Sequence, residues 1–473
     1  MTKKALKIVT IGGGSTFIPE LIDGYIARHK ELPIEEIVLV DIEQGEERLQ
    51  IAADMADRQL KKAGLNWKIT PTLDRFNALK DADFVTTQFR VGPPDVRIKD
   101  ERLPLSHGLI GHENNGAGGV FKSFRTIPVL LEIIEEMEEQ CPDAWLINFT
   151  NPAGMVTEAA IKHGGWEKTI GICNVPIGHE KSVSEALNLP VEELDFHFAG
   201  INHFHWHRVW DKEGNELTEK VIELLYHPDN LSKGDMENIP AEQFNYEQIM
   251  DLKMLPCGYH RYYYIEDEML KLQIEDFNKG NTRAEEVKKI DEELFELYKN
   301  PELDSKPEEL MKRGGAYYSY VACEVISSIY NNKHTEMVVS TQNKGTITDL
   351  PYDSIIETSG VVTSKGFVPY NWGAFENPAA RGMLQLMKGF EETVIRAAIT
   401  GDYNAALHAF TINPLIPGGK IAKTLLDQML YAHKKDLPQF ADKIKEIEEN
   451  QPEDVRYVDK LMKSNSALVL DKA

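Results

Sequence analysis

Cys173 and His203 are the residues whose side chains point first to a particular chemistry. A cysteine thiolate and a neutral imidazole both coordinate divalent transition metals such as manganese, iron, cobalt, nickel and zinc. A buried free cysteine is more often a small core residue, however, and His197, His205 and His207 lie close to His203 in the chain. The pair therefore indicates a divalent metal site, while a structural role for either residue stays open.

A second cofactor is indicated by the run Gly-Gly-Gly-Ser-Thr at residues 12–16, which follows an apolar stretch. Glycines allow a tight turn whose N–H groups face a pyrophosphate at a helix N-terminus. Asp41 ends the next apolar stretch, where a carboxylate can bond the ribose 2′-hydroxyl of NAD. The sequence predicts an NAD site with Gly12, Gly14, Ser15 and Asp41 as contacts. The alternative is a plain tight turn beside a solvated aspartate, because Phe17 replaces the last glycine of the usual pattern.

Tyr259 stands on a turn that Pro256, Cys257 and Gly258 begin, where a phenol can point into a cleft. The free pKa of a phenol is about 10, so it acts as a base only where a metal or arginines favour the phenolate. The tyrosines that follow in the same segment are typical of packing. Tyr259 is thus a candidate base, with packing as the alternative.

Three further polar residues are candidates for contacts to a substrate. Asn151 follows an apolar strand, at the end where doubly wound sheets bind ligands, and an amide there can bond sugar hydroxyls. It could equally cap a helix that begins with Pro152. Arg97 and Arg283 are candidates for holding an anion, although most arginines in a chain of this length lie at the surface.

Alternating apolar and amphipathic segments predict the elements that position these residues. Short apolar runs alternate with segments of helical periodicity in the first part, which favours a doubly wound parallel sheet. Near Phe196 the sequence becomes rich in aromatic residues and histidine, so we expect a nucleotide-binding domain at 1–195 and an α+β substrate- and metal-binding domain at 196–473. The expected strands are 6–11, 37–40, 84–88, 145–149, 169–173, 337–341 and 355–362, and the expected helices include 126–139, 283–297, 383–399 and 421–433.

Length and charge restrict the classes of partner. With 473 residues, of which 42% are hydrophobic, the chain is long enough for two globular domains. Its net charge of −24 argues against nucleic acid as a partner, because such a protein needs a basic face. An apolar stretch long enough for a signal peptide or a membrane span is not found at the N-terminus, and the four cysteines lack CxxC spacing. We therefore expect a cytoplasmic protein with reduced thiols and no membrane partner.

Several segments together resemble glycoside hydrolase family 4, the NAD- and metal-dependent glycosidases, and within it the 6-phospho-β-glucosidases. This family is an exception to the two-carboxylate mechanism of most glycosidases. The resemblance runs from Lys7 to about Pro417. Its markers are the glycine-rich loop, Phe89-Arg90, residues 97–101, GLIGHE at 108–113, NFTNP at 148–152, CNVP at 173–176, GINH at 200–203, the Tyr259 turn and RGG at 313–315.

The resemblance implies a role for each candidate. Cys173 and His203 would hold the metal, for which Mn²⁺ is the first expectation, and Tyr259 would be the base. Glu113 resembles the carboxylate that raises the basicity of this tyrosine. Arg97, Asn151 and Arg283 would contact the phosphorylated sugar. The resemblance further implies a homo-oligomer, a dimer or tetramer, with the two-domain fold of lactate and malate dehydrogenases.

Two sequence details bear on substrate and site. The α-specific enzymes of this family tend to carry an aspartate after the metal-binding cysteine, whereas this chain has Asn174, which favours a β-linked substrate. The family often has two threonines after the glutamate of GLIGHE, and this chain has Asn114 and Asn115 instead. The hydrogen bonding around Glu113 is therefore expected to differ.

The reaction implied is hydrolysis of 6-phospho-β-glucosides through transient oxidation at C3, loss of the C2 proton to Tyr259, elimination, addition of water and re-reduction. NAD would be regenerated in every cycle. One alternative is an NAD-dependent hydroxy-acid dehydrogenase, which would produce NADH in stoichiometric amounts and would not need Cys173. Another is a non-catalytic NAD-sensing protein, which would not need a base.

Overall fold

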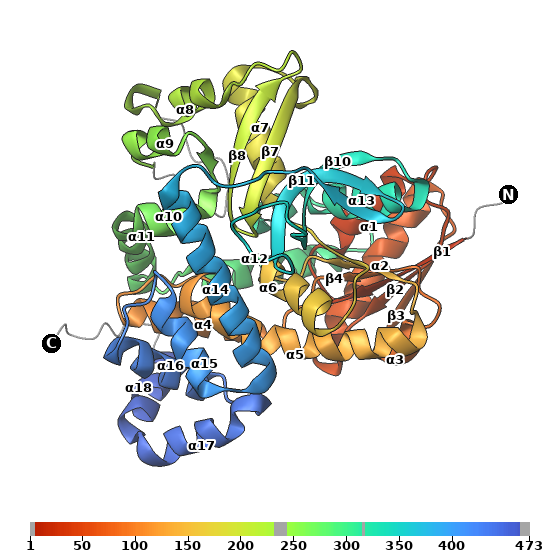
Figure 1. The fold of residues 1–473 in the computed structure, drawn as a ribbon. Helices are drawn as coiled ribbons and strands as arrows, with labels where there is room; N and C mark the ends of the chain where they lie inside the picture. Colours follow the sequence, from red (N-terminus) through yellow and green to blue (C-terminus); the bar gives the residue numbers. More distant parts are fainter. Residues whose placement is uncertain (1–4, 231–243, 315–316, 464–473) are drawn as a thin grey trace.

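The computed structural model describes residues 5–230, 244–314 and 317–463, and its centre is a 12-stranded mixed sheet (Figure 1). In spatial order the strands are β3 (Lys68–Thr72), β2 (Ile34–Val40), β1 (Leu6–Ile11), β4 (Phe84–Thr87), β5 (Trp145–Asn148), β6 (Thr169–Gly171), β10 (Thr335–Gln342), β11 (Ile355–Thr363), β7 (Leu194–Ile201), β8 (Phe204–Asp211) and β9 (Leu255–Pro256). A further strand, β12 (Gly366–Pro369), pairs with β11.

The six strands from β3 to β6 are parallel to one another. Their order, 3-2-1-4-5-6, is that of a doubly wound dinucleotide-binding sheet. β1 and β4 are buried along almost their whole length, which is why they appear in the sequence as continuous apolar runs and not as alternating ones. The predicted α/β class with an N-terminal doubly wound sheet is confirmed.

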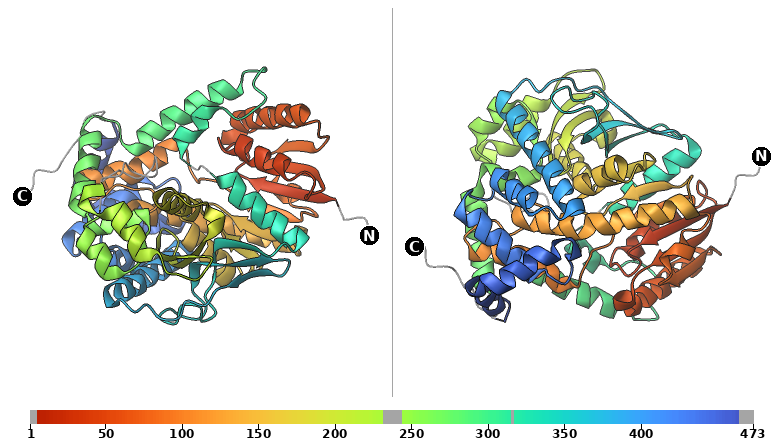
Figure 2. Two further views of the ribbon diagram at one scale, coloured as in Figure 1. Left: turned by 90° about the horizontal axis from the view of Figure 1, so that it is seen from above. Right: turned by 60° about the horizontal axis from the view of Figure 1, so that its bottom comes forward.

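Helices cover both faces of this sheet (Figures 1 and 2). On one face, Leu21, Ala53 and Val325 of three helices share a core with the sheet, and on the other face Phe121 of α5 belongs to the same core as Val38 of β2. The first nine helices are α1 (Ile18–Ala27), α2 (Glu46–Ala63), α3 (Arg75–Ala78), α4 (Pro94–Ser106), α5 (Gly116–Gln140), α6 (Ala153–Glu158), α7 (Val175–Leu187), α8 (Thr218–Tyr226) and α9 (Tyr246–Leu252). The others are α10 (Arg261–Tyr264), α11 (Glu266–Asn278), α12 (Arg283–Tyr298), α13 (Tyr318–Asn331), α14 (Pro378–Thr400), α15 (Tyr403–Ile412), α16 (Lys420–Ala432), α17 (Ala441–Asn450) and α18 (Pro452–Lys463).

The second part of the sheet is antiparallel and continues from the first without a break. β10 pairs with β6, and β11, β7, β8 and β9 follow in that order. Two late strands therefore lie between β6 and β7, which are neighbours in the chain. The expected boundary between residues 195 and 196 falls within β7. The division into domains 1–195 and 196–473 stays a prediction.

The expected elements occur, and the largest difference is at α5. The helix predicted over 126–139 begins earlier, at Gly116. The prediction missed its first turns because the glycines there conceal the helical pattern. These glycines have a packing reason. A Cβ atom at Gly118 would lie 2.2 Å from the carbonyl oxygen of His112, and one at Gly119 would lie 2.6 Å from the carbonyl carbon of Asn114. The first turns of α5 thus pack directly on the backbone of residues 112–114.

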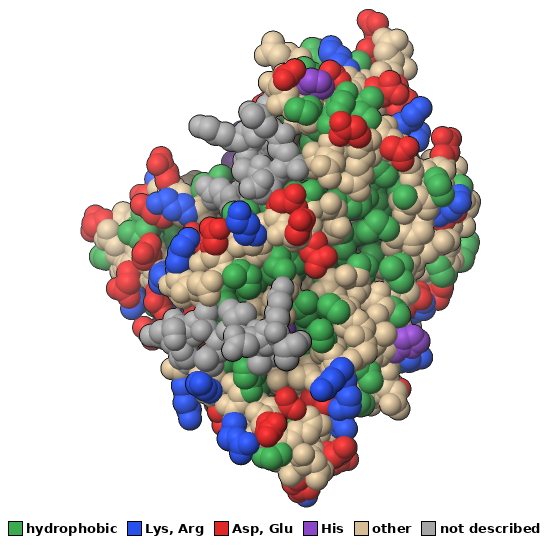
Figure 3. Space-filling view, turned by 90° about the vertical axis from the view of Figure 1, so that its left-hand side faces the viewer, with side chains coloured by type: hydrophobic (Ala, Val, Ile, Leu, Met, Phe, Trp, Pro, Cys, Tyr) green, Lys and Arg blue, Asp and Glu red, His purple; other side chains and the backbone are tan. Residues whose placement is uncertain are grey.

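On the face shown in Figure 3, acidic and basic side chains are interspersed among hydrophobic and neutral polar ones. Among the described residues, none of the helices combines the length and apolar character that crossing a membrane requires.

A buried ion triad joins α6 to α14. Lys388 Nζ lies 2.7 Å from Glu158 Oε2 and 2.7 Å from Glu391 Oε2, and all three side chains are at most 7% exposed. Burial alone would lower the pKa of Lys388, but the two carboxylates raise it above its usual value. The lysine therefore stays charged and balances two nearly completely buried acids.

Replacing Lys388 with methionine is expected to destabilise the protein by about 3–5 kcal/mol, because buried Glu391 loses its counter-charge and Glu158 keeps only the more distant Lys162, 3.8 Å away. Chemical denaturation followed by circular dichroism measures the shift in midpoint. The matched control is Lys434→Met, which removes a lysine from a pair with Glu448 whose side chains are 39% and 40% exposed, and its effect should be much smaller. Equal effects of the two substitutions would show that the triad does not stabilise the fold.

Candidate active site

A cleft of about 1300 Å³ opens at the carboxyl edge of the parallel strands. β1, β2, β5 and β6 all end at this edge, and the polar segments that follow them enter the cleft. All the candidate residues of the sequence line this one cleft, although they come from distant parts of the chain: Gly12, Gly14, Ser15, Asp41, Arg97, Glu113, Asn151, Cys173, His203, Tyr259 and Arg283.

The glycine-rich loop packs so closely that side chains would not fit. Gly12 has φ +93°, and a Cβ atom there would lie 2.9 Å from the backbone of Gln88, which follows β4. The N–H of Gly14 donates to Asp41 Oδ2 at 2.7 Å, so the loop is attached to the end of β2. The residues therefore fit a dinucleotide, with the loop and the start of α1 facing its phosphates and Asp41 near the position of a ribose.

Cys173 and His203 meet at the floor of the cleft. Cys173 follows β6, and His203 occupies the tight turn between β7 and β8 with φ +62°. The distance from Cys173 Sγ to His203 Nε2 is 3.5 Å. A cation bonded to sulfur at ~2.3 Å and to nitrogen at ~2.1 Å, with a tetrahedral angle between the bonds, would separate the two donors by about 3.6 Å. The donor set and its spacing therefore fit a divalent metal.

Glu357 of β11 holds the turn that carries His203. One of its carboxylate oxygens accepts a hydrogen bond from Asn202 Nδ2 at 2.9 Å, and the other lies 2.7 Å from His205 Nδ1. Burial lowers the pKa of His203 to about 3 and raises the pKa of the Cys173 thiol. The imidazole is therefore neutral, with its lone pair available to a cation.

Tyr259 lies directly beside this pair. Its ring stacks on the ring of His203, with centroids 4.1 Å apart and an angle of 27° between the planes. The tyrosine is 8% exposed, and burial raises its pKa well above 10, with Tyr262 and Cys173 adding to the effect. Without a nearby cation the phenol stays protonated, so its use as a base depends on the positive charge that the metal would bring.

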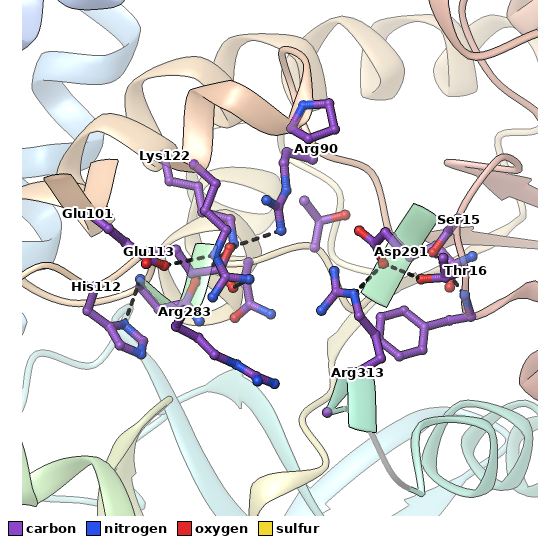
Figure 4. Close-up of a pocket in the computed structure, with 18 of the residues that line it drawn as sticks. Ser15, Thr16, Arg90, Glu101, His112, Glu113, Lys122, Arg283, Asp291 and Arg313 are labelled. Atoms are coloured by element: carbon purple, nitrogen blue, oxygen red, sulfur yellow. Dashed lines mark hydrogen bonds and ion pairs between the residues drawn. The ribbon is translucent and has the colours of Figure 1, made fainter. Parts of the chain in front are cut away.

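Glu113 is the centre of a charged network (Figure 4). Its carboxylate receives Arg97 Nη1 at 2.9 Å, Lys122 Nζ at 2.9 Å and Arg90 Nη2 at 3.0 Å. Burial would raise the pKa of Glu113, but Arg97, Lys122 and Arg90 together lower it well below its usual value. With Glu101, which also pairs with Arg97, the network has three cations against two carboxylates. The excess positive charge suits an anionic ligand.

Arg283 is positioned through the same network. Glu101 Oε2 accepts the N–H of Ala284 at 2.7 Å, which fixes the first turn of α12 beside Arg97. Arg283, the first residue of α12, pairs with Glu286 at 2.6 Å and lines the cleft. Asn151 also lines the cleft, and its Oδ1 accepts the N–H of Ala153 at 3.3 Å. This bond is not the helix cap considered in the sequence, because the N-cap of α6 is Pro152, the residue after Asn151.

Several residues of the cleft were given no role from the sequence. They are Arg90, Lys122, His112, Asp291 and Arg313. Asp291 pairs with Arg313 at 2.6 Å and accepts a hydrogen bond from Thr16 at 3.2 Å (Figure 4). The available signal was that Arg90, His112 and Arg313 lie within the family's marker segments, whereas no motif marks Asp291 or Lys122. Gly315, the last residue of the RGG marker, lies outside the described residues.

A doubly wound sheet, a glycine-rich loop and a thiol–imidazole pair in one cleft are the features of a dinucleotide-binding enzyme with a metal site. The chain belongs to glycosyl hydrolase family 4. The family 4 glycosyl hydrolase model matches residues 7–189, and the model of the family's C-terminal domain matches residues 198–416. The family expected from the sequence is confirmed.

Individual relatives are similar over nearly the whole chain. A probable 6-phospho-β-glucosidase of Bacillus subtilis is 51% identical, with 93% of this chain and 99% of that protein covered. A 6-phospho-β-glucosidase of Escherichia coli is 44% identical, with 93% and 98% covered. The structure of the Thermotoga maritima 6-phospho-β-glucosidase with manganese, NAD⁺ and glucose 6-phosphate has a TM-score of 0.81 and 32% identity, with 91% and 98% covered.

Replacing Cys173 with serine is expected to weaken Mn²⁺ binding by at least about 100-fold, because even the loss of a partner outside the ligand set costs roughly 10- to 100-fold. Isothermal titration calorimetry of the purified protein measures this affinity without substrate. Cys141→Ser is the matched control, since Cys141 is also a buried free cysteine but does not line the cleft. Wild-type affinity in Cys173→Ser would exclude the sulfur as a ligand.

Proposed function

We propose that this protein hydrolyses 6-phospho-β-glucosides to glucose 6-phosphate and an alcohol, with NAD and a divalent cation, foremost Mn²⁺, as cofactors. The observation that carries the proposal is the 3.5 Å contact between Cys173 and His203, with Tyr259 stacked on the imidazole, in the same cleft as the glycine-rich loop. The names of the similar proteins support the substrate class, and the Thermotoga maritima structure supports both cofactors.

The geometry supports an assignment of the two cofactor sites. Gly12, Gly14, Ser15 and Asp41 would hold the dinucleotide, and Cys173 and His203 would hold the cation. When bound, the dinucleotide supplies reversible hydride exchange at C3 of the sugar, and the cation supplies polarisation of the neighbouring oxygens. No redox equivalents are consumed over a complete cycle.

The protein's own groups then handle protons and charge. Tyr259 takes the proton from C2, and positive charge beside its ring lowers the cost of forming the phenolate. Glu113 is ionised and bonded to three cations, so it acts on the tyrosine through its negative field, which makes the phenolate a stronger base. The roles of Tyr259 and Glu113 in catalysis are part of this proposal.

We place the phosphate group of the substrate beside the cationic network around Glu113. Arg97 uses Nε and Nη1 to bond Glu101 and Glu113, which fixes the plane of its guanidinium at the cleft. Arg283 and Asn151 line the same cleft. We assign Arg97, Asn151 and Arg283 to the phosphorylated sugar, since a guanidinium can bond a phosphate through two N–H groups.

The β configuration of the substrate is supported by Asn174, which directly follows Cys173 and lines the cleft. Its side chain is an amide, whereas the α-specific enzymes tend to have an aspartate there. The two alternative functions considered from the sequence would give results different from those of a glycosidase. A hydroxy-acid dehydrogenase would accumulate NADH, and an NAD-sensing protein would bind NAD without turnover. The oligomeric assembly and the cytoplasmic location stay predictions.

Aryl 6-phospho-β-glucosides are expected to be hydrolysed in the presence of NAD and Mn²⁺, and omission of either should abolish turnover. Release of the phenol measures the rate, and absorbance at the NADH band should stay constant after the first turnover. The 6-phospho-α-glucosides and the unphosphorylated β-glucosides are the controls. Accumulation of NADH in proportion to product, or equal rates with the α-anomers, would contradict the proposal.

Replacing Tyr259 with phenylalanine should reduce proton exchange at C2 by about 100-fold or more while NAD affinity is kept, since a positioned base contributes this much. Nuclear magnetic resonance of glucose 6-phosphate in D₂O with NAD and Mn²⁺ follows the exchange. Tyr264→Phe is the control, because Tyr264 belongs to the same segment but does not line the cleft. Unchanged exchange in Tyr259→Phe would assign the base elsewhere.

A further inference from the structure

His112 precedes Glu113 and is held rigidly at the edge of the cleft. The backbone N–H of Gly111 donates to Gln273 Oε1 at 3.1 Å, and Gln273 Nε2 donates to the carbonyl of Gly111 at 3.2 Å. On the other side, Gly118 of α5 packs against the carbonyl oxygen of His112. The backbone around this histidine is therefore fixed by α11 and α5 before any ligand binds.

The hydrogen bonds of the ring determine which nitrogen carries the proton. His112 Nδ1 accepts the backbone N–H of Asn114 at 3.0 Å (Figure 4). Asn115 Nδ2 lies 3.3 Å from the same nitrogen. A ring nitrogen accepts a hydrogen bond through its lone pair and therefore carries no proton. The neutral ring must then carry its proton on Nε2. Asn114 and Asn115 thus convert His112 into a donor of fixed orientation.

The charge state of the ring is set by its surroundings. Burial lowers the pKa of His112 to about 3, and Arg97 and Lys122 contribute in the same direction, against the opposing effect of Glu113. The imidazole is therefore neutral throughout the range in which the protein would work. Its Nε2–H has no hydrogen-bond partner among the described residues, and the side chain lines the cleft.

The ring lies next to the proposed base. The ring centroids of His112 and Tyr259 are 5.4 Å apart with planes at 80°, and those of His112 and Tyr262 are 4.9 Å apart. Tyr259 stacks on His203 as well, so the phenol has imidazole neighbours from two different segments. A sugar whose C2 faces Tyr259 has C1, with its glycosidic oxygen, one bond away from C2.

We propose that His112 is a catalytic residue that donates a hydrogen bond from Nε2 to the glycosidic oxygen as the bond to C1 breaks. This inference rests on the proposed function. In that reaction the cation would polarise oxygens on the carbons that are oxidised and deprotonated, so the oxygen on C1 needs a donor from the protein. Neutral donors fixed in a site of low dielectric stabilise developing negative charge effectively.

The step balances without a charged acid. The bond between C1 and the glycosidic oxygen breaks, and its electron pair goes to that oxygen, where the charge is stabilised by Nε2–H. A water molecule then gives a proton to the departing oxygen, and the remaining hydroxide adds to C1. Tyr259 returns its proton to C2, so His112 is neutral at the start and at the end. Glu113 cannot serve as the donor, because it is ionised, accepts hydrogen bonds from Arg90 and Lys122 and forms an ion pair with Arg97.

The test compares 6-phospho-β-glucosides whose leaving groups range from dinitrophenol through phenol to a simple alcohol. In His112→Phe, which keeps a flat ring and loses the donor, kcat/KM should fall little for dinitrophenol and about 100-fold or more for phenol and the alcohol. His112→Gln, whose amide can donate, should recover part of this loss. His107→Phe is the matched control, because His107 lies outside the cleft, and it should show the wild-type dependence on leaving group.

Proton exchange at C2 of glucose 6-phosphate separates this role from a structural one. Exchange requires the base but no leaving group, so His112→Phe should retain it to within about threefold. A loss of the same size for every leaving group, with exchange reduced in parallel, would overturn the proposal and make His112 a support for Tyr259. Absence of hydrolysis by the wild-type enzyme would instead overturn the proposed function, and the role of His112 with it.

A measurement on the unsubstituted protein tests the premise. Nitrogen-15 resonances of His112, assigned by comparison with His112→Gln, should report a proton on Nε2 and should not titrate between pH 5 and 9. A proton on Nδ1, or titration in this range, would overturn the proposal whatever the substituted enzymes do.

Discussion

The contact between a thiol and an imidazole at 3.5 Å is the constraint on which the whole site depends. The sheet fixes the position of both residues. Cys173 follows a strand of the parallel part of the sheet, and His203 occupies a hairpin of the antiparallel part. β10 and β11 join these two parts, and Glu357 of β11 bonds both Asn202 and His205 around the hairpin turn. The metal site is therefore a product of sheet order, and the neighbouring tyrosine takes its place from the same hairpin through β9.

The net charge of the network around Glu113 is opposite in sign to that of the whole chain. The chain has a net charge of −24, yet its cleft brings Arg90, Arg97 and Lys122 onto one carboxylate. Buried in this way, Glu113 keeps cations in place that would otherwise repel each other, and in doing so remains ionised. An anionic sugar phosphate would thus be attracted by local structure in spite of the global field.

Much of the fold could be predicted from the sequence because its signals are local. Buried parallel strands appear as continuous apolar runs, and the functional residues after β1, β2, β5 and β6 follow from the rule that doubly wound sheets bind ligands at their carboxyl edge. The family's motifs then named the remaining candidates. All eleven candidate residues line one cleft, although their individual roles stay proposals.

What the sequence could not supply was long-range pairing. Nothing in the residues between 335 and 363 indicates that two strands would enter between β6 and β7. The contact of Thr16 with Asp291 spans most of the chain, and the two hydrogen bonds that fix the His112 tautomer depend on a loop geometry that has no pattern of its own. Lys122 was missed because a single lysine on a buried helix carries no sign of the carboxylate it faces.

The insertion of β10 and β11 also limits how the molecule can move. In many two-domain enzymes a flexible linker lets the two domains rotate apart. Here one hydrogen-bonded sheet extends from β1, which precedes the nucleotide loop, to the β7–β8 hairpin that carries His203. Such a rotation would require strands to separate. The separation between the dinucleotide loop and the thiol–imidazole pair is consequently set by the sheet before ligands arrive.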